Sequence, residues 1–276
     1  MNYSRLFSFR ESEDASRPLL EHLDDLRRMV IKIAITLVVA MVVSFFFRSF
    51  LAAFIQKPLM IVDPTRVGSL QSLGVADSMT ISLELSFYAG FILSFPLLLF
   101  FVGEFLFPAL SRAEKRLILP VTAGSFFLFV LGVSFSYYVV LPGTLDFFFR
   151  DAKAMHWVPT WTVRDYYSFT TQFLIAFGVA FEMPIVVLIL VKLGFLNSTT
   201  LRKTRSIAIV TIFTIAAFIT PSPDLMTYLL MGVPMVLLYE VCILLARWVE
   251  DPAEELILEQ RVERNLSAEI EKKGEF

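Results

Sequence analysis

One carboxyl group stands alone in a long apolar stretch. Glu182 is the tenth of the nineteen residues 173–191, and the rest of that run is uncharged. At the centre of a membrane helix a charged side chain costs about 2.5–3.5 kcal/mol or more, so such residues usually face a protein interior or a cavity. Pro184 cannot donate to the carbonyl of Ala180, and Gly178 leaves space one turn earlier. These residues predict a polar notch that admits water or a partner helix. A protonated glutamate between packed helices would have the same sequence.

A second acid, Glu114, lies in the charged segment "FPALSRAEKR" at 107–116. At a membrane surface its carboxylate can accept paired, charge-assisted hydrogen bonds from a guanidinium group. Ser111 and Glu114 also have the spacing of a capping box at the start of a helix, which explains both residues without a ligand. The sequence leaves both interpretations open.

Two further acids have spacings that helix chemistry explains. Asp25, in "HLDDLRR" at 22–28, lies three residues before Arg28 and can pair with it on a helix surface. Asp224, in "TPSPD", follows Ser222 and Pro223, which have the residue types of an N-cap and a first helical position.

The sequence lacks the residue patterns that catalysis or cofactor binding would need. The two histidines, His22 and His156, lie far apart, and the single cysteine is Cys242. The sequence contains no nucleophile elbow, no phosphate-binding loop and no clustered metal ligands. It therefore predicts a protein that is not an enzyme and that uses no cofactor and no metal.

The elements that would position these acids are membrane helices. The chain is 57% hydrophobic and only 18% charged, a composition far from that of a soluble domain. About 20 apolar residues cross a bilayer as a helix. The runs are apolar on all sides, which argues against a β-barrel. An all-α polytopic fold with six spans follows, at about 29–51, 79–103, 117–141, 167–191, 206–220 and 225–246.

The distribution of basic residues predicts the orientation. With a cytoplasmic N-terminus, 18 of the 24 lysines and arginines lie on the inside and six on the outside, as the positive-inside rule requires. Both termini are therefore expected in the cytoplasm. The division of the chain is a mobile cytoplasmic tail at 1–17, a membrane domain at 18–247 and a charged helical tail at 248–276.

The segments between the spans also carry signals. From Pro18 an amphipathic stripe predicts an interfacial helix that precedes the first span. The first outer segment, 52–78, has turn chemistry. The second, 142–166, and the residue that follows it have aromatic side chains suited to the headgroup belt: Trp157, Trp161, Tyr166 and Tyr167. The fifth span has 15 residues before Pro221. At about 1.5 Å per residue it is shorter than a hydrocarbon core of about 30 Å.

Several motifs together resemble the TatC family, the core subunit of the twin-arginine (Sec-independent) protein translocase. They cover the chain from about Pro18 to Arg247 and occur in order: "HLDDLR", "KPL", "FPALSRAEKR", "GVSFSYYVVLP", "FGVAFEMP", "LRKTR" and "TPSPD". The resemblance implies a concave six-helix bundle in the cell inner membrane, with both termini inside and short fifth and sixth helices.

The resemblance also implies which residues carry the function. The receptor site for the signal peptide would comprise Glu114, Asp25, Arg27, Phe105 and Pro108. The family usually has glutamate where Asp25 stands. Glu182, Pro184 and Tyr137 would form an intramembrane polar contact with a partner, and Pro58, Pro96 and Asp224 would shape the outer loops and the second helix.

The expected mechanism is recognition rather than chemistry. Carboxylates at the cytoplasmic surface would accept the guanidinium groups of a twin-arginine signal peptide on a folded cargo protein. Expected partners are such signal peptides, single-span subunits of the TatA and TatB type, the lipid bilayer and further copies of the chain, but no nucleic acid. The proton-motive force would drive translocation. An ion-coupled small-solute transporter and a membrane-protein insertase stay as alternatives, since either could place an acid near the midplane.

Overall fold

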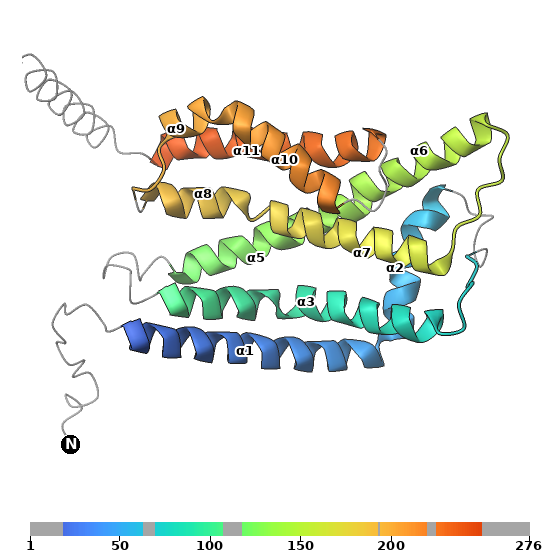
Figure 1. The fold of residues 1–276 in the computed structure, drawn as a ribbon, viewed down its shortest axis with the longest axis horizontal. Coiled ribbons are helices and arrows are strands. Elements are labelled where there is room, and N and C mark those ends of the chain that lie inside the picture. The colour runs from blue at the N-terminus through green and yellow to red at the C-terminus, as the bar shows by residue number, and fades with distance from the viewer. Residues whose placement is uncertain (1–18, 63–69, 107–117, 193, 220–224, 250–276) are drawn as a thin grey trace, which may run out of the picture.

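A computed structural model describes residues 19–62, 70–106, 118–192, 194–219 and 225–249. Helices make up nearly all of these residues (Figure 1). Their bounds are α1 Leu19–Phe46, α2 Arg48–Val62, α3 Asp77–Leu106, α5 Ile118–Phe135, the π-helix η4 Ser136–Val140, α6 Leu141–Ala154, α7 Val163–Ala180, α8 Met183–Lys192, α9 Ser198–Lys203, α10 Arg205–Ile219 and α11 Leu225–Val249.

The predicted spans are confirmed within the described residues. Five helical segments are long and apolar enough to cross a membrane: Leu23–Phe46, Asp77–Phe105, Pro120–Ala154, Val163–Lys192 and Leu225–Val249. The sixth, α10, is apolar but has only 15 residues, about 22 Å at 1.5 Å per residue. The short fifth span expected from the sequence is thus present. The expectation of a short sixth helix is wrong, since α11 has 25 residues.

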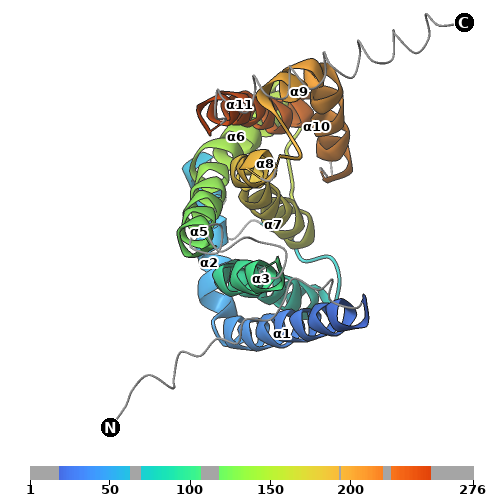
Figure 2. The ribbon, with the colours of Figure 1, turned by 90° about the vertical axis from the view of Figure 1, so that its left-hand side faces the viewer.

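The long helices run along one axis of the molecule, and α7 lies at their centre (Figure 1). Seen end-on, they form an arc from α1 through α3 and α5 to α11 and α10, with α7 and α8 on its inner side (Figure 2). Two hydrophobic clusters share α7. One joins its Phe173 and Phe177 to α8, α10 and α11, and the other joins its Tyr166 and Leu174 to α2 and α3. The fold positions its polar groups around this central helix.

The first outer segment is more ordered than its turn residues predict. Residues 48–62 form α2, and Pro58 lies inside that helix, fully buried. Three tyrosines hold α2 in place: Tyr137 and Tyr166 donate to the carbonyls of Phe54 and Ile55, each at 2.7 Å, and Tyr167 donates to Ala52 at 3.1 Å. The prediction that Tyr166 and Tyr167 lie in the headgroup belt is therefore wrong, since each is only 3% exposed.

The structure tests three other expectations about the spans. The third span continues through η4 and α6 to Ala154, where the sequence predicted an outer loop from 142. The stretch expected to form an interfacial helix before the first span is helical from Leu19 and forms the first part of α1, which is continuous. Pro96 lies inside α3, the second span, as predicted. The tail at 1–17 and residues 250–276 of the other tail lie outside the described residues.

Candidate functional site

The start of α1 and the end of α3 lie at the same end of the bundle (Figures 1 and 2). The start of α1 carries Asp25 and Arg27, and Phe105 is the penultimate residue of α3, so all three belong to this end of the α1–α3 pair. Asp25 and Phe105 are half-buried and Arg27 is exposed. The other two predicted members of the receptor site, Pro108 and Glu114, follow directly after α3 in the chain but lie outside the described residues.

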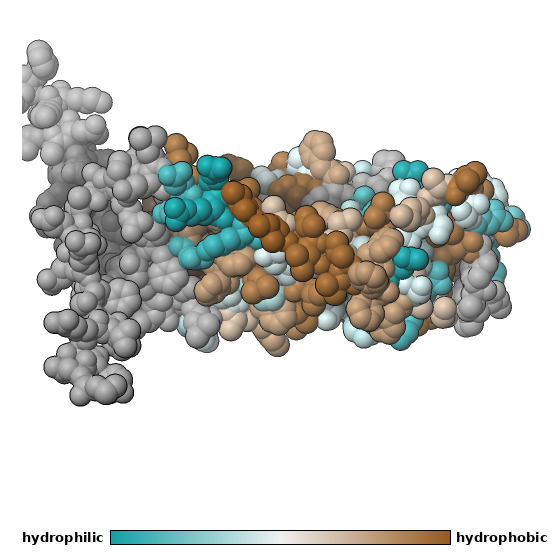
Figure 3. Space-filling view, turned by 90° about the horizontal axis from the view of Figure 1, so that it is seen from below, coloured by the Kyte–Doolittle hydropathy of each residue, from teal (hydrophilic) through white to brown (hydrophobic). Residues whose placement is uncertain are grey.

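This end of the molecule has the surface expected at a membrane boundary. Viewed from the side of α1, hydrophilic residues lie near the end where that helix begins, and a broad hydrophobic band covers the middle of the molecule (Figure 3). The band fits hydrocarbon, and the hydrophilic end fits the headgroup region and water.

An ion pair that the sequence analysis missed joins α1 to α3 at this end. Nζ of Lys32 lies 2.8 Å from Oε2 of Glu104, and the two side chains are 46% and 48% exposed. The ammonium also lies 5.6 Å from the centroid of the Phe101 ring. Each charge interrupts an apolar run, "MVIKIAI" and "FFVGEFLF". Single opposite charges near the same ends of two predicted spans were the sequence signal that could have indicated this ion pair.

The buried carboxyl of Glu182 lies at a break between helices. α7 ends at Ala180 and α8 begins at Met183, so Glu182 falls in the turn between them. Its side chain is 8% exposed, and the hydroxyl of Ser125 on α5 donates to Oε2. Oε1 is buried, with no hydrogen-bond partner among the described residues. The carboxyl group thus keeps an acceptor that a further donor could satisfy.

The space that the sequence assigned to water around Glu182 is filled by protein. A Cβ atom at Gly178 would lie 2.6 Å from Cε2 of Phe129, so the glycine admits that ring against α7. The expectation that Gly178 leaves room for water or a partner chain is therefore wrong. The break before Pro184 agrees with its missing amide donor, and Pro184 itself is buried. Tyr137 lies elsewhere, against α2, and does not join this site.

A second membrane acid, Glu84 on α3, was also missed. The hydroxyl of Ser168 on α7 lies 3.0 Å from Oε1 and 3.2 Å from Oε2 of Glu84. Four residues further along α7, Oε1 of Gln172 is buried without a partner among the described residues. The charge of Glu84 inside "TISLELSF" was visible in the sequence, but its partner on a different span was not.

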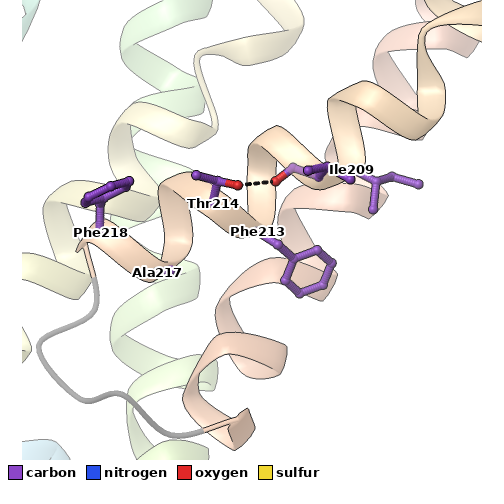
Figure 4. Close-up of a pocket in the computed structure, with 6 residues that line it drawn as sticks. Ile209, Phe213, Thr214, Ala217 and Phe218 are labelled. Carbon is purple, nitrogen blue, oxygen red and sulfur yellow. Dashed lines mark hydrogen bonds between the residues drawn. The ribbon is translucent and has the colours of Figure 1, made fainter.

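The short helix α10 carries an open hollow of about 490 Å³ (Figure 4). Its lining is apolar apart from Thr214, whose hydroxyl donates to the carbonyl of Val210 at 2.8 Å. The lining residues are Ile209, Val210, Phe213, Thr214, Ala217 and Phe218. The hollow presents a hydrophobic surface and contains none of the site residues predicted from the sequence.

Comparison with known proteins decides the family. The family model described as Sec-independent protein translocase protein (TatC) matches residues 21–234. The chain belongs to the TatC family. TatC proteins are components of the Sec-independent, or twin-arginine, protein translocase, and with its apolar helices this chain is a multi-pass membrane protein.

Curated relatives agree with the TatC assignment. A TatC protein of Akkermansia muciniphila is 40% identical over 210 residues, which are 75% of this chain and 60% of that protein. A TatC protein of Deinococcus radiodurans is 37% identical over 237 residues, 85% of this chain and 87% of that protein. The match thus spans less than two thirds of the first protein and most of the second.

Solved structures agree with the TatC fold. A crystal structure of the twin-arginine translocase receptor TatC has a TM-score of 0.75 and 34% identity, and the match covers 83% of this chain and 99% of that one. A second structure of the receptor, in DDM, has a TM-score of 0.74 and 33% identity. These relatives are translocase components, which separates the chain from the solute transporter and the insertase that its sequence left open.

Proposed function

We propose that this TatC chain is the signal-peptide receptor of a twin-arginine translocase in the cell inner membrane, with both termini in the cytoplasm. The observation that supports the proposal is that the start of α1, which carries Asp25 and Arg27, and the end of α3, which carries Phe105, lie at the same end of the bundle. The segment that contains Pro108 and Glu114 begins directly after α3. The excess of basic residues at this end supports its cytoplasmic placement.

In the proposed site, arginine is distinguished from lysine by the geometry of its side chain. A guanidinium group presents a planar fork of donors that fits both oxygens of a carboxylate, whereas a lysine ammonium is a point charge. Glu114, helped by Asp25, accepts the two guanidinium groups, and Arg27 belongs to the same charged surface. Phe105 and Pro108 contact the apolar stretch that follows the arginines. Binding of this kind involves no catalytic step.

The proposed contact with partner subunits lies deeper in the membrane. Only Ser125 among the described residues donates to the Glu182 carboxyl group, and Oε1 is buried without a partner. A polar side chain on the helix of a single-span subunit of the TatA or TatB type donates a hydrogen bond to that oxygen. This contact requires the side chains packed around Pro184 to make room for the partner. Further copies of the chain complete the assembly, and the proton-motive force drives translocation.

Transport into inverted membrane vesicles tests the proposal. A folded reporter with a twin-arginine signal should enter vesicles that contain the wild-type chain and an imposed proton-motive force, and its twin-lysine counterpart should stay outside. Glu114→Gln should abolish import while the protein remains in the membrane at the wild-type level. Equal import of both reporters, or full import with Glu114→Gln, would refute the proposed recognition.

A further inference from the structure

The ion pair between Lys32 and Glu104 lies beside the proposed receptor site. Glu104 directly precedes Phe105 in α3, and Lys32 follows Asp25 by seven residues in α1. Seven residues make about two helical turns, so Asp25 and Lys32 lie on one face of α1, about 10 Å apart along its axis. A carboxylate already held by a cation therefore lies about two turns deeper than the acid that the family resemblance assigns to recognition.

The pair needs its charges balanced because of where it lies. Glu104 is the penultimate residue of one segment apolar enough to span a membrane, and Lys32 is the tenth of the 24 residues of another. An unpaired charge within such a segment is costly. The two side chains nevertheless remain about half exposed. The pair thus balances both charges and leaves the Glu104 carboxylate accessible to an incoming group.

An arginine of a visiting peptide can displace the Lys32 side chain from Glu104 without upsetting this charge balance. One cation takes the place of another, so the carboxylate is never left bare, and a guanidinium can bind both of its oxygens. A long side chain in a helix leans toward the N-terminus, so a released Lys32 ammonium can reach the predicted cytoplasmic surface. The exchange therefore favours arginine over lysine in the visiting peptide.

We propose that Glu104 is a further arginine-binding carboxylate of the signal-peptide site, and that Lys32 occupies it until a guanidinium group of the peptide displaces it. This inference rests on the proposed receptor function and adds a residue to it. Consecutive side chains of an extended segment point in opposite directions. Two neighbouring arginines can thus engage an acid at the tip of α1 and Glu104 at the same time.

Affinity measurements with the full chain in lipid nanodiscs test the exchange. The probe is a fluorescent synthetic signal peptide with two consecutive arginines before an apolar stretch, compared with its twin-lysine version. Loss of the competing cation in Lys32→Gln should tighten twin-arginine binding about tenfold, and Glu104→Gln should weaken it about tenfold. Lys32→Arg keeps the charge but holds Glu104 by a fork, so it should weaken binding several-fold.

A double variant and a matched ion pair make the test specific. Lys32→Gln should bring no gain when combined with Glu104→Gln, because the two residues act through one contact. Arg205 of α10 and Glu240 of α11 also form an ion pair between helices, with side chains 50% and 33% exposed. Glu240→Gln breaks that pair away from the proposed site and should leave peptide affinity unchanged.

The outcomes separate the inference from the function on which it rests. If the wild-type chain binds the twin-arginine and twin-lysine peptides equally, the receptor function fails and the inference fails with it. If arginine is preferred but Lys32→Gln brings no gain, or its gain survives in the double variant, the inference alone is overturned. The same holds if Glu104→Gln binds as tightly as the wild type.

Discussion

The packing of α1 depends on a glycine in α3. A Cβ atom at Gly90 would lie 2.7 Å from the backbone nitrogen and 2.9 Å from Cα of Met41, and 3.0 Å from the carbonyl carbon of Ala40. These are backbone atoms and cannot rotate away. Gly90→Ala therefore forces the two helices apart locally by about 0.5–1 Å, a gap that forfeits a quarter to a half of each dispersion contact.

The cost of that separation can be estimated. Overpacking by one methyl group typically costs about 1–3 kcal/mol, and close approach through small residues is a main source of stability between membrane helices. Few residues of α1 are buried, so it has little other packing to compensate. Gly90→Ala should lower the melting midpoint by several degrees in a matched detergent.

Gly143 provides the control for this measurement. A Cβ atom there would meet no atom within 4 Å, and alanine is favoured over glycine in a helix by roughly 0.5–1 kcal/mol. Gly143→Ala in α6 should therefore leave the midpoint unchanged or raise it slightly. Equal midpoints for the two variants would refute the close approach of α1 and α3.

Two further substitutions test single hydrogen bonds. Ser125→Ala removes the hydroxyl that donates to Glu182 and should destabilise the protein by about 1–3 kcal/mol, measured by thermal melting. Ser125→Thr keeps a donor and should lose less stability. Equal losses of stability in the two variants would argue against the bond. Tyr166→Phe removes the hydrogen bond to the carbonyl of Ile55, so it should lower the stability of the protein by about 1–3 kcal/mol and expose α2 to limited proteolysis. If α2 in the variant resists the protease as well as in the wild type, Tyr166 does not tether that helix.

The spans were predictable because hydrocarbon constrains them so strongly. A run of about 20 apolar residues has few alternatives to a membrane helix, and the missing amide donor of Pro184 indicated the break beside Glu182. The contents of the notch were not predictable, because the ring that fills the space at Gly178 comes from Phe129, far away in the sequence. Sequence spacing indicates where a helix is interrupted, whereas the neighbouring helix decides what occupies the interruption.

Contacts between distant segments account for the other differences. The turn residues of the first outer segment concealed α2, which is held by bonds from Tyr137 and Tyr166 across 83 and 111 residues. Lys32 and Glu104 are 72 residues apart, and each alone resembles an ordinary charge at the end of a span. Single opposite charges in two spans indicate that a pair can form, but no local pattern shows which distant residues meet.

Site-specific photocrosslinking tests the central claim most directly. A photoreactive residue at position 105 or 108, in membrane vesicles, should crosslink to a twin-arginine precursor and only weakly to its twin-lysine version. Glu114→Ala should abolish the crosslink, because the guanidinium groups then lose their carboxylate. Equal crosslinking of the two precursors, or an undiminished crosslink with Glu114→Ala, would contradict the claim that carboxylates at this end of the bundle recognise the signal.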